Sequence, residues 1–155
     1  MNLLLGIGNP RHGDDALGPV FSRAFRHPDW LPINAGAAPE NFTSLIRRLR
    51  PELLVLLDAA DMGLPPGALR RLSPDGLRER DFGTHAPSLA QLVAFLSQDI
   101  PRILILGIQP LCLLPGRLSP PVRSALHALG RQLPSFPSAL LPSAGASDML
   151  PPLHE

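Results

Sequence analysis

The sequence contains no lysine and only one cysteine, and both absences narrow the chemistry that the protein can perform. All 14 basic residues of the 155-residue chain are arginines. A chain without lysine has no Walker phosphate loop, no Schiff-base amine and no Ser-Lys dyad. Cys112 alone excludes disulfides within the chain and multi-cysteine zinc sites. Because Cys112 lies in the apolar run LCLLPG, we expect it to contribute to packing rather than to act as a nucleophile.

Long apolar segments and concentrated charge are also missing. No apolar run reaches the roughly 18 residues that a membrane-spanning helix needs, and the N-terminal segment lacks the basic region of a secretion signal. The formal net charge is +1, and the arginines are dispersed apart from short clusters such as Arg47–Arg50. This pattern argues against a nucleic-acid-binding surface. We therefore expect a cytoplasmic protein that binds neither nucleic acid nor membrane.

Uncharged apolar runs alternate with helical patterns along the chain. Such runs are typical of strands buried on both faces of a parallel sheet. They predict strands at residues 3–7, 30–34, 53–57 and 103–106, with a short edge strand at 68–72. The sequence thus predicts an α/β fold: a three-layer α/β/α sandwich with a twisted, mostly parallel sheet of about five strands. We expect residues 1–134 to form a single domain and the Pro-rich residues 135–155 to form a poorly ordered tail.

Two of the apolar runs lead directly into acidic residues. The first, in LLLGIGNPRHGDDALG, is followed by Asp14 and Asp15, and the third, in LLVLLDAAD, is followed by Asp58 and Asp61. His85, in GTHAPSL, precedes another helical pattern. Because the carboxyl ends of parallel strands share one edge of a sheet, these side chains are candidates for a common site.

Asp15, Asp58 and His85 together would offer two carboxylates and one imidazole. Such a set suits a divalent metal such as nickel, zinc or cadmium and leaves positions open for a substrate. Simpler roles also exist: the Asp14–Asp15 pair is suited to a helix N-terminus, and Asp58 and Asp61 to capping the turn at residues 62–63. A lone histidine before a helix is commonly a surface or capping residue.

The glycines of the first loop allow another interpretation. Gly6 and Gly8 follow a strand as they do in dinucleotide-binding loops, but Arg11 occupies the position of the third glycine. Acids at the start of the following helix would also repel a pyrophosphate. A flavodoxin-like module that binds a small ligand is therefore the weaker hypothesis.

Five motifs resemble one known family. They are GIGNPRHGDDALGP, AGAAPEN, VLLDAADMGLPPG, GTHAPSL and ILGIQP, and they cover the chain from Leu3 to about Leu133. In this order they resemble the endopeptidases that mature [NiFe] hydrogenases by trimming the large subunit. The DAADMGLPPG and GIQP segments most resemble the branch that serves formate-hydrogenlyase (hydrogenase 3).

The resemblance implies a phosphorylase/hydrolase-like fold and an enzyme that cleaves a C-terminal peptide from a nickel-loaded large-subunit precursor. We expect the protein to be a monomer. Asp15, Asp58 and His85 match the residues that hold metal in this family. The nickel would come with the substrate and serve for recognition, and zinc or cadmium could replace it in a crystal. Where the family often has an aspartate, this chain has Asn34. A non-catalytic nickel-binding maturation factor would need the same three ligands and is the main alternative.

Two routes to hydrolysis remain open at this point. The metal would polarise the scissile carbonyl, or water would be activated by the metal or by a free carboxylate. Asp14 and Asp61 are the supporting candidates for that carboxylate. No Ser-His-Asp or Cys-His arrangement stands out, which argues against a covalent intermediate.

Overall fold

The computed structural model describes residues 1–73 and 86–136, without the side chains of residues 86–88. Its strands are β1 (Asn2–Ile7), β2 (Trp30–Gly36), β3 (Leu53–Ala59), β4 (Leu69–Leu72) and β5 (Ile103–Ile108). They form one sheet in the order β2-β1-β3-β5-β4. The pairs β1–β2, β1–β3 and β3–β5 are parallel, and β4 joins β5 antiparallel at the edge. The predicted mostly parallel, five-stranded sheet is confirmed.

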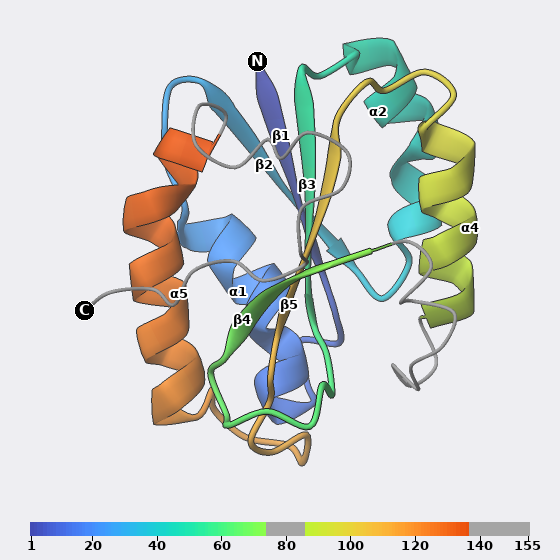
Figure 1. Ribbon diagram of the computed structural model, residues 1–155. Helices are drawn as coiled ribbons and strands as arrows, with labels where there is room; N and C mark the ends of the chain where they lie inside the picture. The colour runs from blue at the N-terminus through green and yellow to red at the C-terminus, as the bar shows by residue number, and fades with distance from the viewer. Residues whose placement is uncertain (74–85, 137–155) are drawn as a thin grey trace.

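Helices cover both faces of this sheet (Figure 1). Helices α1 (Leu17–Ala24) and α5 (Pro120–Gln132) lie on one face, and α2 (Thr43–Leu49) and α4 (Ala86–Leu96) lie on the other. Short 3-10 helices at Gly13–Ala16 and Pro39–Phe42 precede α1 and α2, and a third at Leu133–Ser135 follows α5. The expected three-layer sandwich is therefore observed, and no helix in the described ranges is long and apolar enough to cross a membrane.

The central strands are uncharged over most of their length because both of their faces are buried. Successive side chains of a strand point to opposite faces. Leu4 and Val55 accordingly pack in the core beneath α1 and α5, whereas Leu5 and Leu56 pack in the core beneath α2 and α4. This two-sided burial explains why the strands appear in the sequence as continuous apolar runs rather than as alternating patterns.

The core continues past the end of α5. Phe136 is only 5% exposed and packs with the α1/α5 core, so the packed part of the chain reaches beyond residue 134. On the facing helix, Phe21 and Phe25 stack with ring centroids 5.3 Å apart, and Phe25 meets Trp30 edge-on at 6.0 Å. These contacts fix the end of α1 against the start of β2.

The chain reverses its direction across the sheet between β1 and β3. After β1 the chain passes through α1 on one face to β2, whereas after β3 it continues toward the other edge of the sheet, to β4 and then through α4 on the opposite face to β5. The connections that follow β1 and β3 therefore diverge to opposite faces of the sheet. In open α/β sheets this divergence is where ligands bind.

Candidate active site

Asp15 and Asp58 both lie at the carboxyl ends of these two strands. Asp58 is the next-to-last residue of strand β3, where its Cα is paired with that of Gly107, and Asp15 lies in the short 3-10 helix that follows β1. Asp58 is 8% exposed, and its Oδ1 is buried without a hydrogen-bond partner in the described part of the chain. The Asp15 Oδ2 accepts a hydrogen bond of 2.9 Å from the backbone N–H of Asn9.

The two carboxylates are close enough to repel each other. Burial raises the pKa of Asp58 well above its ordinary value of 3.8, and the negative charge of Asp15 raises it further. A hydrogen bond from the Ala59 backbone opposes these effects only in part. A buried acid beside a second acid becomes stable either by holding a proton or by sharing a cation. The pair is thus chemically suited to proton exchange or to cation binding.

Gly8 allows Asp15 to approach the end of β1. It has a φ of +138°, and a Cβ at this position would collide with the Asp15 carbonyl oxygen. Any L-residue here would therefore displace the turn that carries Asp15. Both glycines of this loop allow close backbone contacts, of Gly6 with Gly18 and of Gly8 with Asp15. These contacts explain the two glycines without a bound pyrophosphate.

Asp14 has a different environment from its neighbour. Its side chain is fully buried and accepts four hydrogen bonds: 2.8 Å from Leu111 N, 3.1 Å from Cys112 N, 2.7 Å from Ser119 N and 2.8 Å from Ser119 Oγ. The expectation of a free carboxylate at Asp14 is therefore wrong, as is that of a cap for its own helix. Asp14 instead connects the β1 loop to residues 111–119 across 97 to 105 positions of sequence.

The expected packing role of Cys112 is also wrong. Its side chain is exposed, although it lies within an apolar run. The reason is that the backbone of this segment pairs with the β1 loop: Cys112 N donates to Asp14 Oδ2, and Cys112 O accepts from Asp14 N at 2.9 Å. Backbone hydrogen bonding to a buried acid thus holds the segment at the surface.

Gln109 is a site residue to which the sequence assigned no role. Its side chain is buried, and its Oε1 accepts hydrogen bonds from Met62 N at 2.6 Å and Leu64 N at 3.3 Å. Its Nε2 donates to Asp61 Oδ1 at 3.2 Å. Asp61 itself is exposed and also accepts from Gly63 N, as expected for a turn cap. Gln109 therefore orders the loop after Asp58; the ILGIQP motif was the available signal.

The third predicted ligand, His85, lies outside the described residues. Within the ranges that the structure describes, no group of three His, Cys, Asp or Glu side chains is arranged to hold a metal. The three-ligand set remains a prediction. Asn34, which stands where an aspartate was expected, uses its Oδ1 to accept a hydrogen bond from Gly36 N at 3.1 Å. Gly36 O in turn accepts from Gly8 N at 2.9 Å, so the end of β2 supports the same loop.

Comparison with known proteins identifies the family. A family model described as hydrogenase maturation protease matches residues 20–133. The chain belongs to this family of proteases. It is 42% identical over 113 residues to the hydrogenase 3 maturation protease of Escherichia coli strain K12, covering 70% of this chain and 72% of that protein. The resemblance seen in the sequence, including that to the hydrogenase 3 branch, is confirmed.

Solved structures agree with this assignment. The solution structure of the endopeptidase HycI from Escherichia coli matches with a TM-score of 0.79 and 34% identity. The match covers 89% of the present chain and 92% of the HycI chain. A crystal structure of a hydrogenase 3 maturation protease has a TM-score of 0.78 and 37% identity, with coverage of 86% and 88%. An enzyme assignment therefore replaces the two alternatives of a non-catalytic nickel-binding factor and a small-ligand module.

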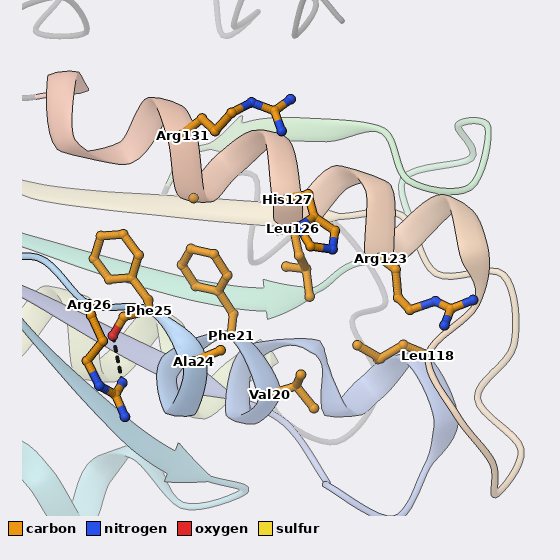
Figure 2. Close-up of a pocket in the computed structure, with 11 residues that line it drawn as sticks. Val20, Phe21, Ala24, Phe25, Arg26, Leu118, Arg123, Leu126, His127 and Arg131 are labelled. Carbon is orange, nitrogen blue, oxygen red and sulfur yellow. Dashed lines mark hydrogen bonds between the residues drawn. The ribbon is translucent and has the colours of Figure 1, made fainter.

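The protease also has a groove that is separate from the acid pair. It lies between α1 and α5, has a volume of about 480 Å³, and is lined by apolar side chains that include Phe21, Phe25 and Leu126 (Figure 2). Arg123 and Arg131 of α5 lie at its rim. Neither Asp15 nor Asp58 lines this groove, which belongs to an outer layer of the sandwich.

Proposed function

We propose that this protease removes a C-terminal peptide from the large-subunit precursor of a [NiFe] hydrogenase after nickel has been inserted. Asp15, Asp58 and His85 would complete the coordination of the nickel that the precursor carries. The nickel is thus part of the substrate and acts as the recognition element. Zinc or cadmium would be suitable stand-ins in a binding experiment.

The observation that carries this proposal is the buried Oδ1 of Asp58, which has no hydrogen-bond partner among residues 1–73 and 86–136 and lies beside the Asp15 carboxylate. An isolated buried carboxylate is costly, and a neighbouring carboxylate adds to that cost. A divalent cation delivered by the precursor would offset both costs. A precursor without nickel would leave them in place, so the same pair of acids would favour the loaded substrate.

The roles of the remaining carboxylates follow from their hydrogen bonds. Asp14 positions the loop and takes no part in proton transfer, because both of its oxygens accept hydrogen bonds within the protein. Asp61 is exposed and uses Oδ1 for both of its hydrogen bonds. Asp61 is therefore the supporting carboxylate that is available to activate water if the nickel does not do so.

The test is to incubate the protease with nickel-loaded and nickel-free precursor and to measure the product masses. We expect the loaded precursor to lose a C-terminal peptide and the nickel-free precursor to remain intact. Equal cleavage of both forms would disprove recognition of nickel. Cleavage of neither would disprove the proposed substrate.

Variants then assign the residues. Asp15→Asn and His85→Ala should each lower the cleavage rate by about 100-fold or more, as expected for loss of a metal ligand or an electrostatic catalyst. The matched control is Asp29→Asn, which alters a side chain that is 78% exposed and lies just before β2. Normal cleavage by His85→Ala would remove that residue from the proposed set.

A further inference from the structure

A short exposed segment beside the acid site carries three leucines. We call residues 111–114 the leucine loop. Leu111, Leu113 and Leu114 are 59%, 53% and 72% exposed. The other large exposed apolar side chains of the described residues are scattered singly along the chain (Met1, Val20, Leu31 and Phe95). Clustered apolar exposure of this kind marks an interaction surface far more often than scattered exposure does.

The backbone of the leucine loop is anchored. The buried Asp14 carboxylate accepts hydrogen bonds from Leu111 N and Cys112 N, and Asp14 N donates to Cys112 O. Gly13 adds a close contact, since a Cβ there would lie 2.5 Å from Leu114 O and 2.6 Å from Cys112 O. These contacts therefore hold the backbone of the leucine loop in place, and the leucine side chains are exposed to solvent.

The same anchors place the leucine loop next to the acid pair. Asp14, which binds the loop, directly precedes Asp15. Two residues before Leu111, the Gln109 side chain holds the backbone of Met62 and Leu64, in the segment that follows Asp58. The loop is thus connected to both of the strand ends that form the site. A polypeptide entering the site must pass the surfaces that border it.

We propose that the leucine loop is the docking surface for an apolar stretch of the precursor polypeptide adjoining the scissile bond. This inference rests on the proposed function, because it takes the precursor as the occupant. The segment from Pro110 to Gly116 contains no charged residue. Its complement is therefore an uncharged apolar stretch rather than an acidic or basic one. The loop would confer affinity for the polypeptide, whereas the acids recognise the metal.

The test is the triple variant Leu111→Ser/Leu113→Ser/Leu114→Ser, assayed on nickel-loaded precursor. Loss of the apolar contacts that these three leucines would make with the precursor should raise KM by at least about tenfold and leave kcat within about twofold. The matched control is Leu31→Ser, which alters a leucine that is 37% exposed near the start of β2, away from the carboxyl ends of the strands. Its KM should stay within about twofold of the wild-type value. A KM of the triple variant equal to that of the control, or a fall in kcat alone, would overturn the inference.

A binding experiment separates this inference from the proposed function. The nickel-free precursor, which the proposed function leaves uncut, is the substrate whose affinity is measured for the wild-type protease and for the triple variant. If the triple variant binds at least about tenfold more weakly than the protein with all three leucines, the docking role of the leucine loop is supported. Equal binding overturns that role. If the wild-type protease binds the nickel-loaded precursor but leaves it intact, the proposed cleavage fails while the binding comparison still decides the docking surface. Absence of binding of the nickel-free precursor to the wild-type protease would overturn the docking surface, whereas cleavage of the nickel-loaded precursor decides the proposed function separately.

Discussion

Replacing Asp14 with alanine removes the acceptor of four hydrogen bonds from a fully buried position. Three of the donors are backbone N–H groups and the fourth is the Ser119 hydroxyl. The hydroxyl can rotate to another partner, but the amides of Leu111, Cys112 and Ser119 cannot. The variant therefore leaves the buried Ser119 N–H and the partly buried Leu111 and Cys112 N–H groups without this acceptor. It weakens the attachment of residues 111–119 to the β1 loop, which keeps the backbone hydrogen bond from the N–H of residue 14 to Cys112 O.

The expected loss of stability is large for a single substitution. Each hydrogen bond to a charged group is worth about 1.5–3 kcal/mol, and part of this is offset by the cost of burying the carboxylate. We expect Asp14→Ala to lower the free energy of unfolding by about 3–5 kcal/mol. Asp14→Asn keeps one carbonyl acceptor but turns an N–H group toward donors, so it should lower the free energy by about 2–3 kcal/mol.

The effect should depend on pH. Burial raises the pKa of Asp14, but the hydrogen bonds from Ser119, Leu111 and Cys112 together outweigh it, so the pKa is lowered below 3.8. A lowered pKa in the folded state contributes stability that is present above the unfolded-state pKa and is lost as the pH falls through the folded-state value. The difference between wild type and Asp14→Ala should thus be greatest near neutral pH and shrink below about pH 4.

Urea unfolding followed by the fluorescence of Trp30 measures this difference. Trp30 is the only tryptophan and is 5% exposed in the α1/α5 core. With an m-value of about 2 kcal/mol/M, the midpoint for Asp14→Ala should fall by about 1.5–2.5 M. Asp61→Ala, at an exposed position, should change the free energy of unfolding by less than about 1 kcal/mol. A loss below about 1 kcal/mol for Asp14→Ala, or one that is the same at pH 3.5 and pH 7, would refute the reasoning.

Three further predictions concern the surroundings of the acid pair. Asp58→Asn should abolish cleavage yet raise the free energy of unfolding at neutral pH by about 0.5–2 kcal/mol. The reason is that burial, and then the charge of Asp15, raise the pKa of Asp58. The wild type therefore loses stability as the pH rises from 3.8 through the folded-state pKa. Urea unfolding at several pH values should show that the stability difference between Asp58→Asn and wild type vanishes below pH 3.8. Gln109→Ala should lower the free energy of unfolding by about 1–3 kcal/mol. It should also speed amide hydrogen exchange at Met62 and Leu64, because their N–H groups lose the Gln109 acceptor. Unchanged exchange at these two residues would contradict the assigned role. Gly13→Ala should lower the melting temperature by several degrees, because φ is +54° and a Cβ would meet the leucine-loop carbonyls; an unchanged melting temperature would show that the contact relaxes freely.

Most of the fold could be predicted because it depends on local pattern. The apolar runs at β1, β3 and β5 are uncharged over lengths typical of strands, and the stripes of α2 and α5 repeat with helical spacing. Short connections between alternating strands and helices then restrict the topology to a few solutions. The resemblance in five motifs led to the same architecture and to the family.

The site was predictable only in outline. That Asp15 and Asp58 follow parallel strands was enough to place them at one edge of the sheet. The sequence could not distinguish Asp14 from Asp15, because both follow the same strand and precede the same helix. Their roles differ through contacts almost a hundred positions away, with Leu111 and Ser119, that no local pattern records.

The sequence by itself determined which segments form strands and helices, which family the chain belongs to, and which strand ends carry acids, since these follow from the order and polarity of neighbouring residues. Only the tertiary structure decided that Asp14 is a buried anchor, that Gln109 orders the loop after Asp58, and that Cys112 and the three leucines face solvent. The physical reason is that burial and hydrogen bonding depend on which segments meet in space. Two adjacent aspartates on one turn point in different directions, and the surroundings they meet there determine their chemistry.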